Sequence, residues 1–519
     1  MTAHSPITNS RYDFIVCGAG PSGSVVAARL AENPHVSVLL IEAGGSDDVP
    51  EVRTPGQWVS NLGTERDWAF VAQPNPYLNN RAIPLNMGKV LGGSSSINVM
   101  VWARGHRNDW EHFAAEAGDD AWGYESVLEI YRRIENWQGA SDPRRRGTGG
   151  PVYVQTAQNP QPVAIAMVEA ARSLGFPTFD SPNGAMMEGR GGAALNDLIV
   201  RNGQRSNIFR SYVFPKLGQP NLTVRTRALV SRLIFNGTTV AGVEVIEAGE
   251  RRRYMADREV ILSLGAINTP KVLMQSGIGP EAELRQHGIP IVQHLAGVGR
   301  NHQDHVSFGC IFESNEPQPV GHGGSEATFY WKSDASLPLP DIFHCQLEFP
   351  VPTPETASRG APQHGWMVFA GVSHPKSRGS VHLSGPEVND PVRIEANTLS
   401  HPDDLKAAFV TVDLCRQMAA RAPFKQLLKR EAMPGNLDGS AMETYLRDSA
   451  VTYWHQSCTA RMGRDAMSVV DGKLKVYGIE NLRIADASIM PNVTSGNIMA
   501  PCVVIGERAA EIIKAQHGI

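Results

Sequence analysis

A glycine-rich loop between two apolar segments is the feature of this sequence that most restricts its fold. Residues 12–17 form a short apolar run, the loop Gly18-Ala-Gly20-Pro-Ser22-Gly23 follows directly, and residues 25–31 carry small apolar side chains at helical spacing. A second apolar run at 36–41 is followed by Glu42. This order of strand, loop, helix and strand predicts the βαβ unit that opens a dinucleotide-binding fold.

The three glycines of this loop have the spacing that a bound pyrophosphate requires. Gly18 permits a tight turn after the strand, Gly20 lets the backbone approach the pyrophosphate, and Gly23 lets the helix pack closely on the sheet. Glu42 is placed to accept hydrogen bonds from ribose hydroxyls, and its charge disfavours the 2′-phosphate of NADP. The loop alone does not distinguish FAD from NAD, and a glycine-rich turn without a ligand is the alternative interpretation.

Composition and charge narrow the possible functions. The 519 residues are too many for one compact core, and 42% hydrophobic with 19% charged residues is typical of a globular protein. A net charge of −4 does not favour a nucleic-acid partner. The six cysteines lack the spacing of a metal site or a disulfide framework, so we predict neither. The basic triplets at 144–146 and 251–253 are isolated, and we expect them to lie in solvated loops.

The N-terminal residues suggest where the protein is found. Residues 1–11 are polar and lack the hydrophobic region of a signal peptide. No apolar segment approaches the roughly 20 residues that span a bilayer. We therefore expect a cytoplasmic protein without a transmembrane segment.

The character of the sequence changes in its middle. From about 310 to 451 the chain is richer in proline and alternating aromatic residues, with a strand-like run at 366–372. This change indicates a sheet-based domain inserted between pieces of a cofactor domain. We predict an α/β fold in which a discontinuous Rossmann-like domain carries an inserted α+β substrate domain built on an antiparallel sheet. The predicted cofactor domain covers 11–155, 196–308 and 452–519, and the predicted substrate domain covers 156–195 and 309–451.

Five further segments resemble the signatures of the glucose–methanol–choline (GMC) oxidoreductase family. The first two are GKVLGGSSSINVMVWARG at 88–105 and GAINTPKVLMQSGIG at 265–279. The others are NHQDH at 301–305, with histidine in place of the usual leucine, HQSCTARMG at 455–463 and DASIMP at 486–491. Because these segments recur in the family's order along the whole chain, the sequence is identified as a member. It is similar to choline dehydrogenase-like and to aryl or heteroaryl alcohol oxidase members.

The resemblance implies a flavoprotein that binds FAD in an extended form. By position, Glu42 contacts the adenosine ribose, the backbone of Val230 pairs with adenine, and Asp486 contacts the ribityl-pyrophosphate region. Some relatives attach FAD to a histidine at the place of Ile97, which cannot form that bond, so we predict non-covalent FAD. The residues expected to bind the cofactor are Gly18, Gly20, Ser22, Gly23, Glu42, Gly92, Ser95, Asn98, Val99, Val230, Asp486 and Ala487.

Two catalytic positions follow from the same resemblance. His455 aligns with the family's active-site histidine, and histidine is suited to removing a hydroxyl proton at neutral pH. In some accounts of the family this histidine instead donates a hydrogen bond to an alkoxide. The second position, usually His or Asn, is Met499, a weak acceptor that cannot donate. His455 therefore acts nearly alone, Asn497 or a water substitutes, or the usual chemistry is impaired; our hypothesis is that Met499 shapes an apolar pocket.

The predicted reaction is FAD-dependent oxidation of a primary alcohol, aromatic or heteroaromatic, to the aldehyde. Candidate pocket residues by family position are Met100, Trp102, Tyr453 and Trp454, although these rings could simply pack around the flavin. Glu326 could suit a choline-like cation but also occurs in relatives that do not use choline. The alternatives are a choline or aliphatic alcohol dehydrogenase, a non-redox lyase of the same fold, and a flavin-binding protein without turnover. The expected electron acceptor is O2 or a quinone-type carrier.

Overall fold

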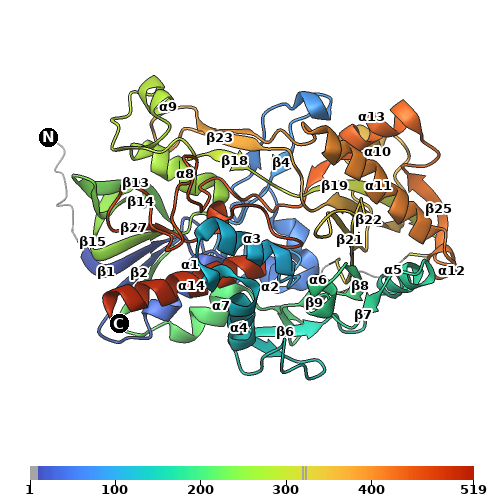
Figure 1. Cartoon of the computed structure of the whole chain (residues 1–519), viewed down its shortest axis with the longest axis horizontal. Coiled ribbons are helices and arrows are strands. Elements are labelled where there is room, and N and C mark those ends of the chain that lie inside the picture. Colours follow the sequence, from blue (N-terminus) through green and yellow to red (C-terminus); the bar gives the residue numbers. More distant parts are fainter. Residues whose placement is uncertain (1–9, 318–320, 322–323) are drawn as a thin grey trace.

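The computed structural model describes residues 10–317, 321 and 324–519. The residues 1–9, on which part of the expected localisation rests, lie outside this description. Two large sheets lie at opposite ends of the molecule, and the C-terminus lies beside the first of them (Figure 1). The architecture confirms the predicted combination of a Rossmann-like α/β part with a second part built on a largely antiparallel sheet.

The first sheet has a parallel core and an antiparallel edge. Its strand order is β12-β2-β1-β15-β14-β13, and β27 pairs in parallel with the second half of β15. Its strands β1, β2, β12 and β15 are parallel, and β14 and β13 continue from β15 as an antiparallel meander. The bounds are β1 (Ser10–Cys17), β2 (Val38–Ile41), β12 (Leu222–Arg225), β13 (Ala228–Asn236), β14 (Thr239–Glu247), β15 (Glu250–Leu262) and β27 (Leu482–Ile484).

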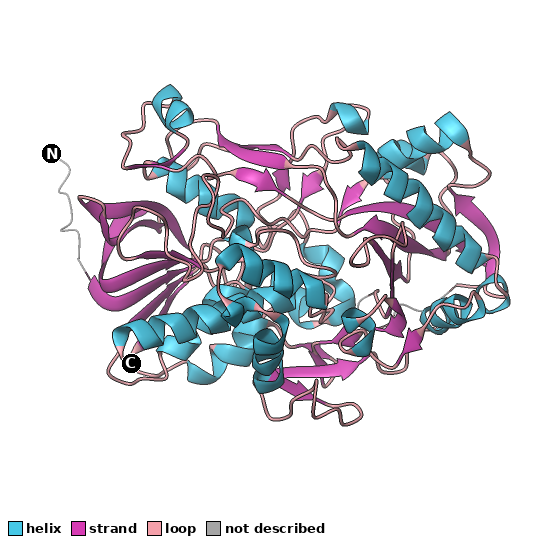
Figure 2. Cartoon of the chain, in the orientation of Figure 1, coloured by secondary structure: helices cyan, strands magenta, loops and turns pink. Residues whose placement is uncertain are grey.

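Helix α1 (Pro21–Leu30) completes the predicted βαβ unit. Gly20 is its N-cap and Pro21 its first residue, a position where the missing N–H of proline has no cost. Helix α14 (Met499–His517) packs along α1, as Figure 2 shows among the helices beside the first sheet. A Cβ at Gly506 would lie 2.7 Å from the backbone oxygen of Ser22, so glycine is needed for this close approach.

The second sheet has the order β25-β19-β22-β21-β20-β8-β7, and β26 pairs with β19. All of its pairs are antiparallel except β7 with β8. Helices α5 (Pro162–Ser173) and α11 (Pro402–Ala419) pack against it. Its strands are β7 (Thr178–Phe179), β8 (Gly192–Leu195), β19 (Val306–Ser314), β20 (Ala327–Trp331), β21 (Ile342–Leu347), β22 (Gly365–Val372), β25 (Leu428–Met433) and β26 (Val451–Thr452).

The remaining elements are mostly short. The other helices are α2 (Pro50–Arg53), α3 (Arg107–Ala117), α4 (Tyr124–Ile134), α6 (Ala185–Glu188), α7 (Ile208–Tyr212), α8 (Gly265–Gln275), α9 (Glu281–Gln286), α10 (Pro354–Ala357), α12 (Ala422–Lys425) and α13 (Gly439–Ser449). The other strands are β3 (Phe70–Val71), β4 (Pro84–Leu85), β5 (Glu135–Trp137), β6 (Val152–Thr156), β9 (Asp197–Leu198), β10 (Val200–Arg201), β11 (Gln204–Arg205), β16 (Ile278–Gly279), β17 (Gln293–His294), β18 (Arg300–His302), β23 (Gly379–Leu383) and β24 (Val392–Glu395).

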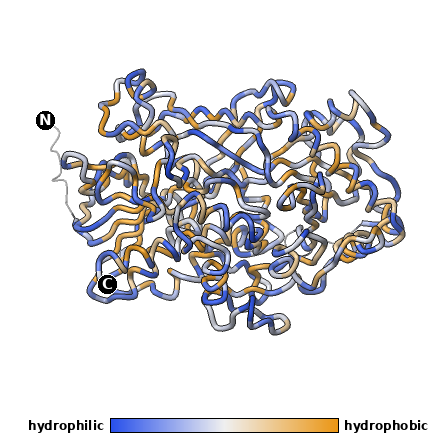
Figure 3. Tube along the Cα trace, viewed as in Figure 1, coloured by the Kyte–Doolittle hydropathy of each residue, from blue (hydrophilic) through white to orange (hydrophobic). Residues whose placement is uncertain are grey.

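Each sheet has its own hydrophobic core. The strands of the first sheet are largely apolar, whereas many outlying loops are hydrophilic (Figure 3). Parallel strands covered on both faces need such continuous apolar sequences, and β2 reads Val-Leu-Leu-Ile with every residue buried. Within the part of the chain that the structure describes, no helix has both the length and the apolar character needed to span a bilayer.

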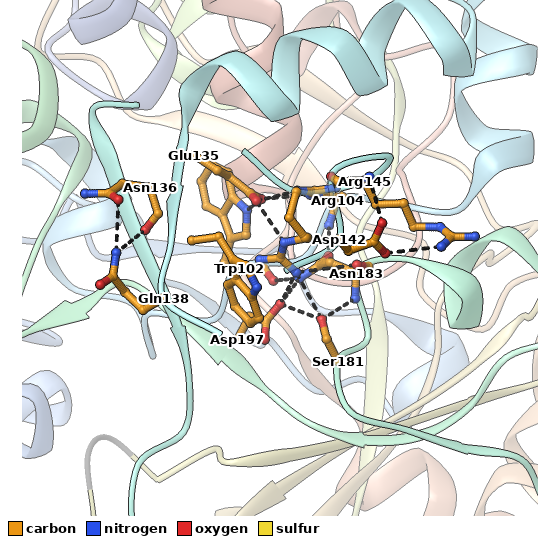
Figure 4. A network of polar contacts seen from close by, with 12 residues as sticks. Trp102, Arg104, Glu135, Asn136, Gln138, Asp142, Arg145, Ser181, Asn183 and Asp197 are labelled. Atoms are coloured by element: carbon orange, nitrogen blue, oxygen red, sulfur yellow. Dashed lines mark hydrogen bonds and ion pairs between the residues drawn. The ribbon is translucent and has the colours of Figure 1, made fainter. Parts of the chain in front are cut away.

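A buried ionic network holds the segment that follows residue 100 (Figure 4). Glu135 is fully buried and accepts hydrogen bonds from Trp102 Nε1 at 2.6 Å and Arg104 Nε at 2.8 Å. Arg146 lies 3.0 Å from Glu135 and 2.8 Å from Asp197, and is 7% exposed. Our expectation of a solvated basic triplet was therefore wrong for Arg146, whose guanidinium is paired with two buried carboxylates.

Removing Glu135 should destabilise the protein strongly. Glu135→Ala leaves Arg104 and Arg146 buried without this carboxylate, and we expect the free energy of unfolding to fall by about 3–5 kcal/mol. Denaturant unfolding of the full chain measures this change. The matched control is Glu125→Ala, which removes the exposed ion pair with Arg107 and should cost less than about 1 kcal/mol. Equal unfolding midpoints for the two variants would contradict the assigned role of Glu135.

Candidate active site

A large cavity lies where the carboxyl ends of the parallel strands face the second sheet. The segments that follow β1, β2, β15 and β27 contribute Gly18, Glu42, Ser263 and Asp486 to its wall. The second sheet contributes, among others, Leu347 from β21. Ligands of open α/β sheets bind at this edge, because the loops after the parallel strands converge there.

The glycine loop forms one end of the cavity. A Cβ on Gly20 would meet no atom within 4 Å, so its backbone faces open space that a pyrophosphate can fill. Gly18 has φ of +101°, and a Cβ there would lie 2.2 Å from the oxygen of Ser263. Ser22 lines the cavity, whereas Gly23 lies beneath the loop, where a Cβ would lie 1.9 Å from the oxygen of Gly18.

Glu42 is held by the backbone at the end of β2. Its Oε2 accepts from Ala19 N at 2.9 Å and its Oε1 from Gly44 N at 2.8 Å. Burial raises the pKa of Glu42 to about 7, while these N–H groups act in the opposite direction. Each carboxylate oxygen keeps a second lone pair, so the geometry suits a ribose hydroxyl donor.

The wall beyond Glu42 is formed by β13 and helix α8. Val230 lines the cavity as expected, and Gln275 lies in the same wall. The Gln275 amide donates to the oxygen of Glu387, while its Oε1 is buried and has no hydrogen-bond partner among the described residues. A free acceptor here fits an amino group such as that of adenine. Gln275 lies in the second family signature, at 265–279, but the sequence analysis did not assign it a role.

The loop before residue 100 forms the middle of the cavity. A Cβ at Gly93 would lie 2.8 Å from the Cα of Gly20, so this loop contacts the glycine loop backbone to backbone. Ser95, Asn98 and Val99 line the cavity, and Gly92, at φ +90°, supports the turn from outside its wall. The Arg205 guanidinium donates to Asn98 Oδ1 at 2.8 Å.

Asp486 and Ala487 close the cavity on the side of β27. Asp486 accepts hydrogen bonds from Gly265 N at 2.9 Å, Thr269 Oγ1 at 2.6 Å and Ser488 N at 2.8 Å. Burial raises the pKa of Asp486. Ala487 lines the cavity directly after it, so both predicted contacts face the same space.

His455 points into the cavity next to an amide. Its Nε2 lies 3.3 Å from Asn497 Nδ2, and its Nδ1 lies 2.9 Å from Nδ1 of His305. The residue is 7% exposed, and burial lowers the pKa of His455 to about 3. Met499 also lines the cavity, but its sulfur accepts from Asn98 Nδ2 at 3.3 Å. The side chain beside the histidine is thus Asn497 and not the residue at the aligned second position.

Aromatic rings surround the space next to His455. Trp454 lies edge-on to Trp58 and Phe369, with ring centroids 6.2 and 6.4 Å apart. Tyr453 and Trp68 also line the cavity. The sequence analysis did not select Trp58, Trp68 or Phe369, because each lies outside the family signatures used there.

Two residues assigned to the substrate pocket lie elsewhere. Met100 is fully buried and does not line the cavity. Trp102 is also fully buried, with its ring nitrogen bound to Glu135. Glu326 is outside the lining as well, and its Oε2 accepts from Gln161 N at 2.6 Å.

Among the described residues, the charged side chains lining the cavity are Glu42, Lys271 and Asp486.

Known proteins match this chain over its whole length. A family model described as GMC oxidoreductase matches residues 12–307, and a second with the same description matches residues 375–506. The mitochondrial choline dehydrogenase of Mus musculus is 35% identical, with 100% of this chain and 92% of that protein covered. The oxygen-dependent choline dehydrogenase of Brucella suis biovar 1 is 35% identical, with 96% and 95% covered.

Solved structures share the fold. Pyridoxine 4-oxidase from Mesorbium loti superposes with a TM-score of 0.92 at 32% identity, covering 98% of this chain and 99% of that one. A formate oxidase gives a TM-score of 0.89 at 28% identity, covering 98% and 99%. A fungal aryl-alcohol oxidase is 22% identical with a TM-score of 0.86, and this likeness concerns the fold alone.

The flavin should be released from the protein without breaking a covalent bond. Ile97 lines the cavity but has no nucleophilic atom. Acid precipitation of the holoprotein is therefore expected to leave the yellow flavin in the supernatant. A yellow pellet would contradict non-covalent binding.

Proposed function

The chain belongs to the GMC oxidoreductase family, and on this premise we propose that it oxidises an aromatic or heteroaromatic primary alcohol to the aldehyde. FAD-dependent oxidation of a CH–OH donor is the general chemistry of the protein. The aromatic character of the substrate and the roles of individual residues are what we propose here.

The observation that carries the substrate class is the wall beside His455. It consists of aromatic and apolar side chains with the neutral amides of Asn86 and Asn497. The charged lining residues are Glu42 and Asp486, which follow strands of the first sheet, and Lys271 in helix α8. Planar rings stack favourably against such aromatic side chains. A neutral ring can enter this space without leaving a charge unpaired.

Proton removal is assigned to His455. Because burial lowers its pKa to about 3, the ring is neutral at physiological pH and its Nε2 can take the hydroxyl proton. Asn497, 3.3 Å from that nitrogen, is placed to donate a hydrogen bond to the substrate oxygen as negative charge develops there. Bound FAD supplies the acceptor for the hydride of the carbinol carbon. The loops around Gly20, Ser95 and Ala487 would hold it.

A choline or aliphatic alcohol is the second candidate. The 35% identity with the choline dehydrogenases named above favours it, and aromatic rings can hold a quaternary ammonium through cation–π attraction. The absence of a carboxylate from the described lining beside His455 argues against it. The charge of the substrate therefore separates the two candidates.

Anaerobic flavin reduction tests the substrate class. The holoprotein is mixed with benzyl, furfuryl and pyridine-ring alcohols, choline and short aliphatic alcohols, and loss of the visible flavin absorbance is followed. Choline is paired with its neutral isostere 3,3-dimethyl-1-butanol, and benzyl alcohol with cyclohexylmethanol. We expect fastest reduction by the planar ring alcohols and faster reduction by the isostere than by choline.

Faster reduction by choline than by its neutral isostere and the ring alcohols would contradict the aromatic substrate and favour a choline-like cation. Flavin that stays oxidised with every alcohol would favour a non-redox reaction on the same fold. Air is then admitted after reduction. Rapid return of the flavin absorbance would identify O2 as an electron acceptor, whereas slow return would favour a quinone-type carrier.

Replacing the base should slow reduction without releasing the flavin. His455→Ala is expected to lower the rate of flavin reduction by about 10²–10⁴-fold, the usual contribution of a general base. Stopped-flow measurement with the best alcohol, at matched flavin content, gives this ratio. A wild-type rate would remove His455 from its assigned role.

Met499 should influence which alcohols are accepted. Met499→Asn replaces an apolar side chain of the cavity by an amide, and we expect kcat/KM for the ring alcohol relative to a short alcohol to fall about tenfold or more. Met462→Leu, a substitution at a fully buried methionine outside the cavity, is the control. Unchanged turnover and preference in Met499→Asn would contradict the pocket-shaping role.

A further inference from the structure

Two buried histidines meet at the back of the active site. Nδ1 of His305 lies 2.9 Å from Nδ1 of His455, and their ring planes are at 84°. The residues are 1% and 7% exposed. One hydrogen lies between the two nitrogens, because two N–H groups would repel and two lone pairs would leave both buried acceptors unpaired.

The outer nitrogen of each ring indicates which ring donates. Burial, then the neighbouring His455 and His374, hold the pKa of His305 well below its usual value, whereas the carbonyls of Thr494 and Ser373 act in the opposite direction. Carbonyl oxygens accept hydrogen bonds, so they favour an N–H on the His305 ring, and an N–H on Nε2, the nitrogen that does not face His455, is compatible with this. Nε2 makes no hydrogen bond of ordinary geometry within the described residues.

The contacts of His455 in the cavity indicate which of the two histidines donates the hydrogen bond. The Asn497 amide nitrogen lies 3.3 Å from Nε2 of His455 and donates to it, so that nitrogen carries a lone pair. The hydrogen of neutral His455 is then on Nδ1, and it points at the Nδ1 lone pair of His305. The contact with Asn497 thus fixes the arrangement of hydrogens in the pair, and the surroundings of His305 are compatible with it.

We propose that His305 is a positioning residue that fixes the tautomer of His455, so that the Nε2 lone pair, which accepts from Asn497 in this structure, is available to the substrate hydroxyl when the alcohol takes the place of that contact. The inference deepens the proposed function and rests on the role of His455 as base. In turnover the O–H bond of the alcohol breaks and an N–H bond forms at Nε2. The carbinol C–H bond breaks and its electron pair leaves with the hydride. The resulting imidazolium keeps its Nδ1–H on His305, and the Nε2 proton later leaves to the electron acceptor or solvent.

A neutral partner distinguishes this pair from a carboxylate–histidine pair. Asp304 is adjacent, but it accepts from the backbone N of His455 at 2.9 Å and from the hydroxyl of Thr452. A carboxylate on Nδ1 would favour the charged ring and raise the pKa of His455. With His305 there, burial dominates, and His455 stays unprotonated on Nε2 throughout the neutral range.

Few other titratable groups face the pair among the described residues. The Tyr453 ring lies parallel to His455 at 5.8 Å between centroids, and its hydroxyl donates to carbonyls of Phe343 and Phe369. His374, whose pKa is lowered by burial, acts on His305 electrostatically and bonds Ser495 Oγ at 2.8 Å. Neither group supplies an alternative acceptor for Nδ1 of His455.

Two substitutions distinguish the effect of losing the hydrogen-bond acceptor of His305 from the effect of changing the volume of its ring. His305→Phe keeps an aromatic ring but cannot accept a hydrogen bond, whereas His305→Asn offers Oδ1 close to the position of Nδ1. We expect the rate of flavin reduction at pH 7 to fall about 10²–10⁴-fold in His305→Phe and to recover to within about tenfold of wild type in His305→Asn. Flavin content is measured in both variants, so that loss of cofactor is not mistaken for loss of rate.

The pH profile and the ring nitrogens provide readouts that packing damage would not change. The wild-type rate should be level over the neutral range, whereas His305→Phe should gain rate with rising pH as hydroxide replaces the misoriented base. Nitrogen NMR of the histidine-labelled protein should show His455 with a protonated Nδ1 in wild type and a mixture of tautomers in His305→Phe. His302→Phe is the control, since His302 is 1% exposed and neither ring nitrogen has a partner among the described residues.

The outcomes distinguish this inference from the proposed function. Loss of rate in His455→Ala with a wild-type rate and unchanged nitrogen signals in His305→Phe would overturn the positioning role alone. An equal, pH-independent loss in His305→Phe and His305→Asn would overturn it as well, because the acceptor would then not matter. A wild-type rate in His455→Ala would remove the base on which both proposals rest.

Discussion

Direct backbone-to-backbone contact between distant loops is the constraint on which the rest of this structure depends. The glycine loop after β1 lies against the segment after β15 and against the loop that begins at Gly92. Added Cβ atoms would fall 2.2 Å from Ser263 at Gly18 and 2.8 Å from Gly20 at Gly93. Because no side chain separates these backbones, the three segments can line one cavity. The fingerprint glycines therefore matter as much for bringing the loops together as for admitting a phosphate.

Pairing between strands also brings the two buried histidines together. Strand β26 pairs with the start of β19, and Tyr453 N donates to the oxygen of His305 at 3.1 Å. This register puts His305 and His455, which are 150 positions apart in the sequence, at hydrogen-bond distance. Asn497 reaches the opposite nitrogen from the turn before α14. His455 is therefore contacted from two sides, by His305 just before β19 and by Asn497 just before α14.

The sequence predicted the cofactor half of the cavity better than the substrate half. The positions of Gly20 and Glu42 follow from rules of spacing, because a phosphate and a ribose each impose fixed geometry, and that of Asp486 follows from the family resemblance. The rings beside His455 come from segments whose sequences indicate burial without saying what they face. The alignment placed Met499 at the second position and left Asn497 as one of several substitutes, whereas the structure places the Asn497 amide 3.3 Å from the imidazole. Arg146 was misjudged because nothing in the local sequence shows that Glu135 is buried, and its other carboxylate partner, Asp197, is 51 positions away.

Contacts between the two ends of the described chain have a consequence for biosynthesis. The hydroxyl of Ser22 in α1 donates to the oxygen of Cys502 in α14 at 2.7 Å, and these residues are 480 positions apart. A nascent chain emerging from the ribosome must therefore hold α1 without its neighbour until almost all later elements have been made. The apolar face of α1 is then available to chaperones, and the cofactor space cannot close during translation of the intervening sheet domain. We therefore expect flavin to bind only late in maturation.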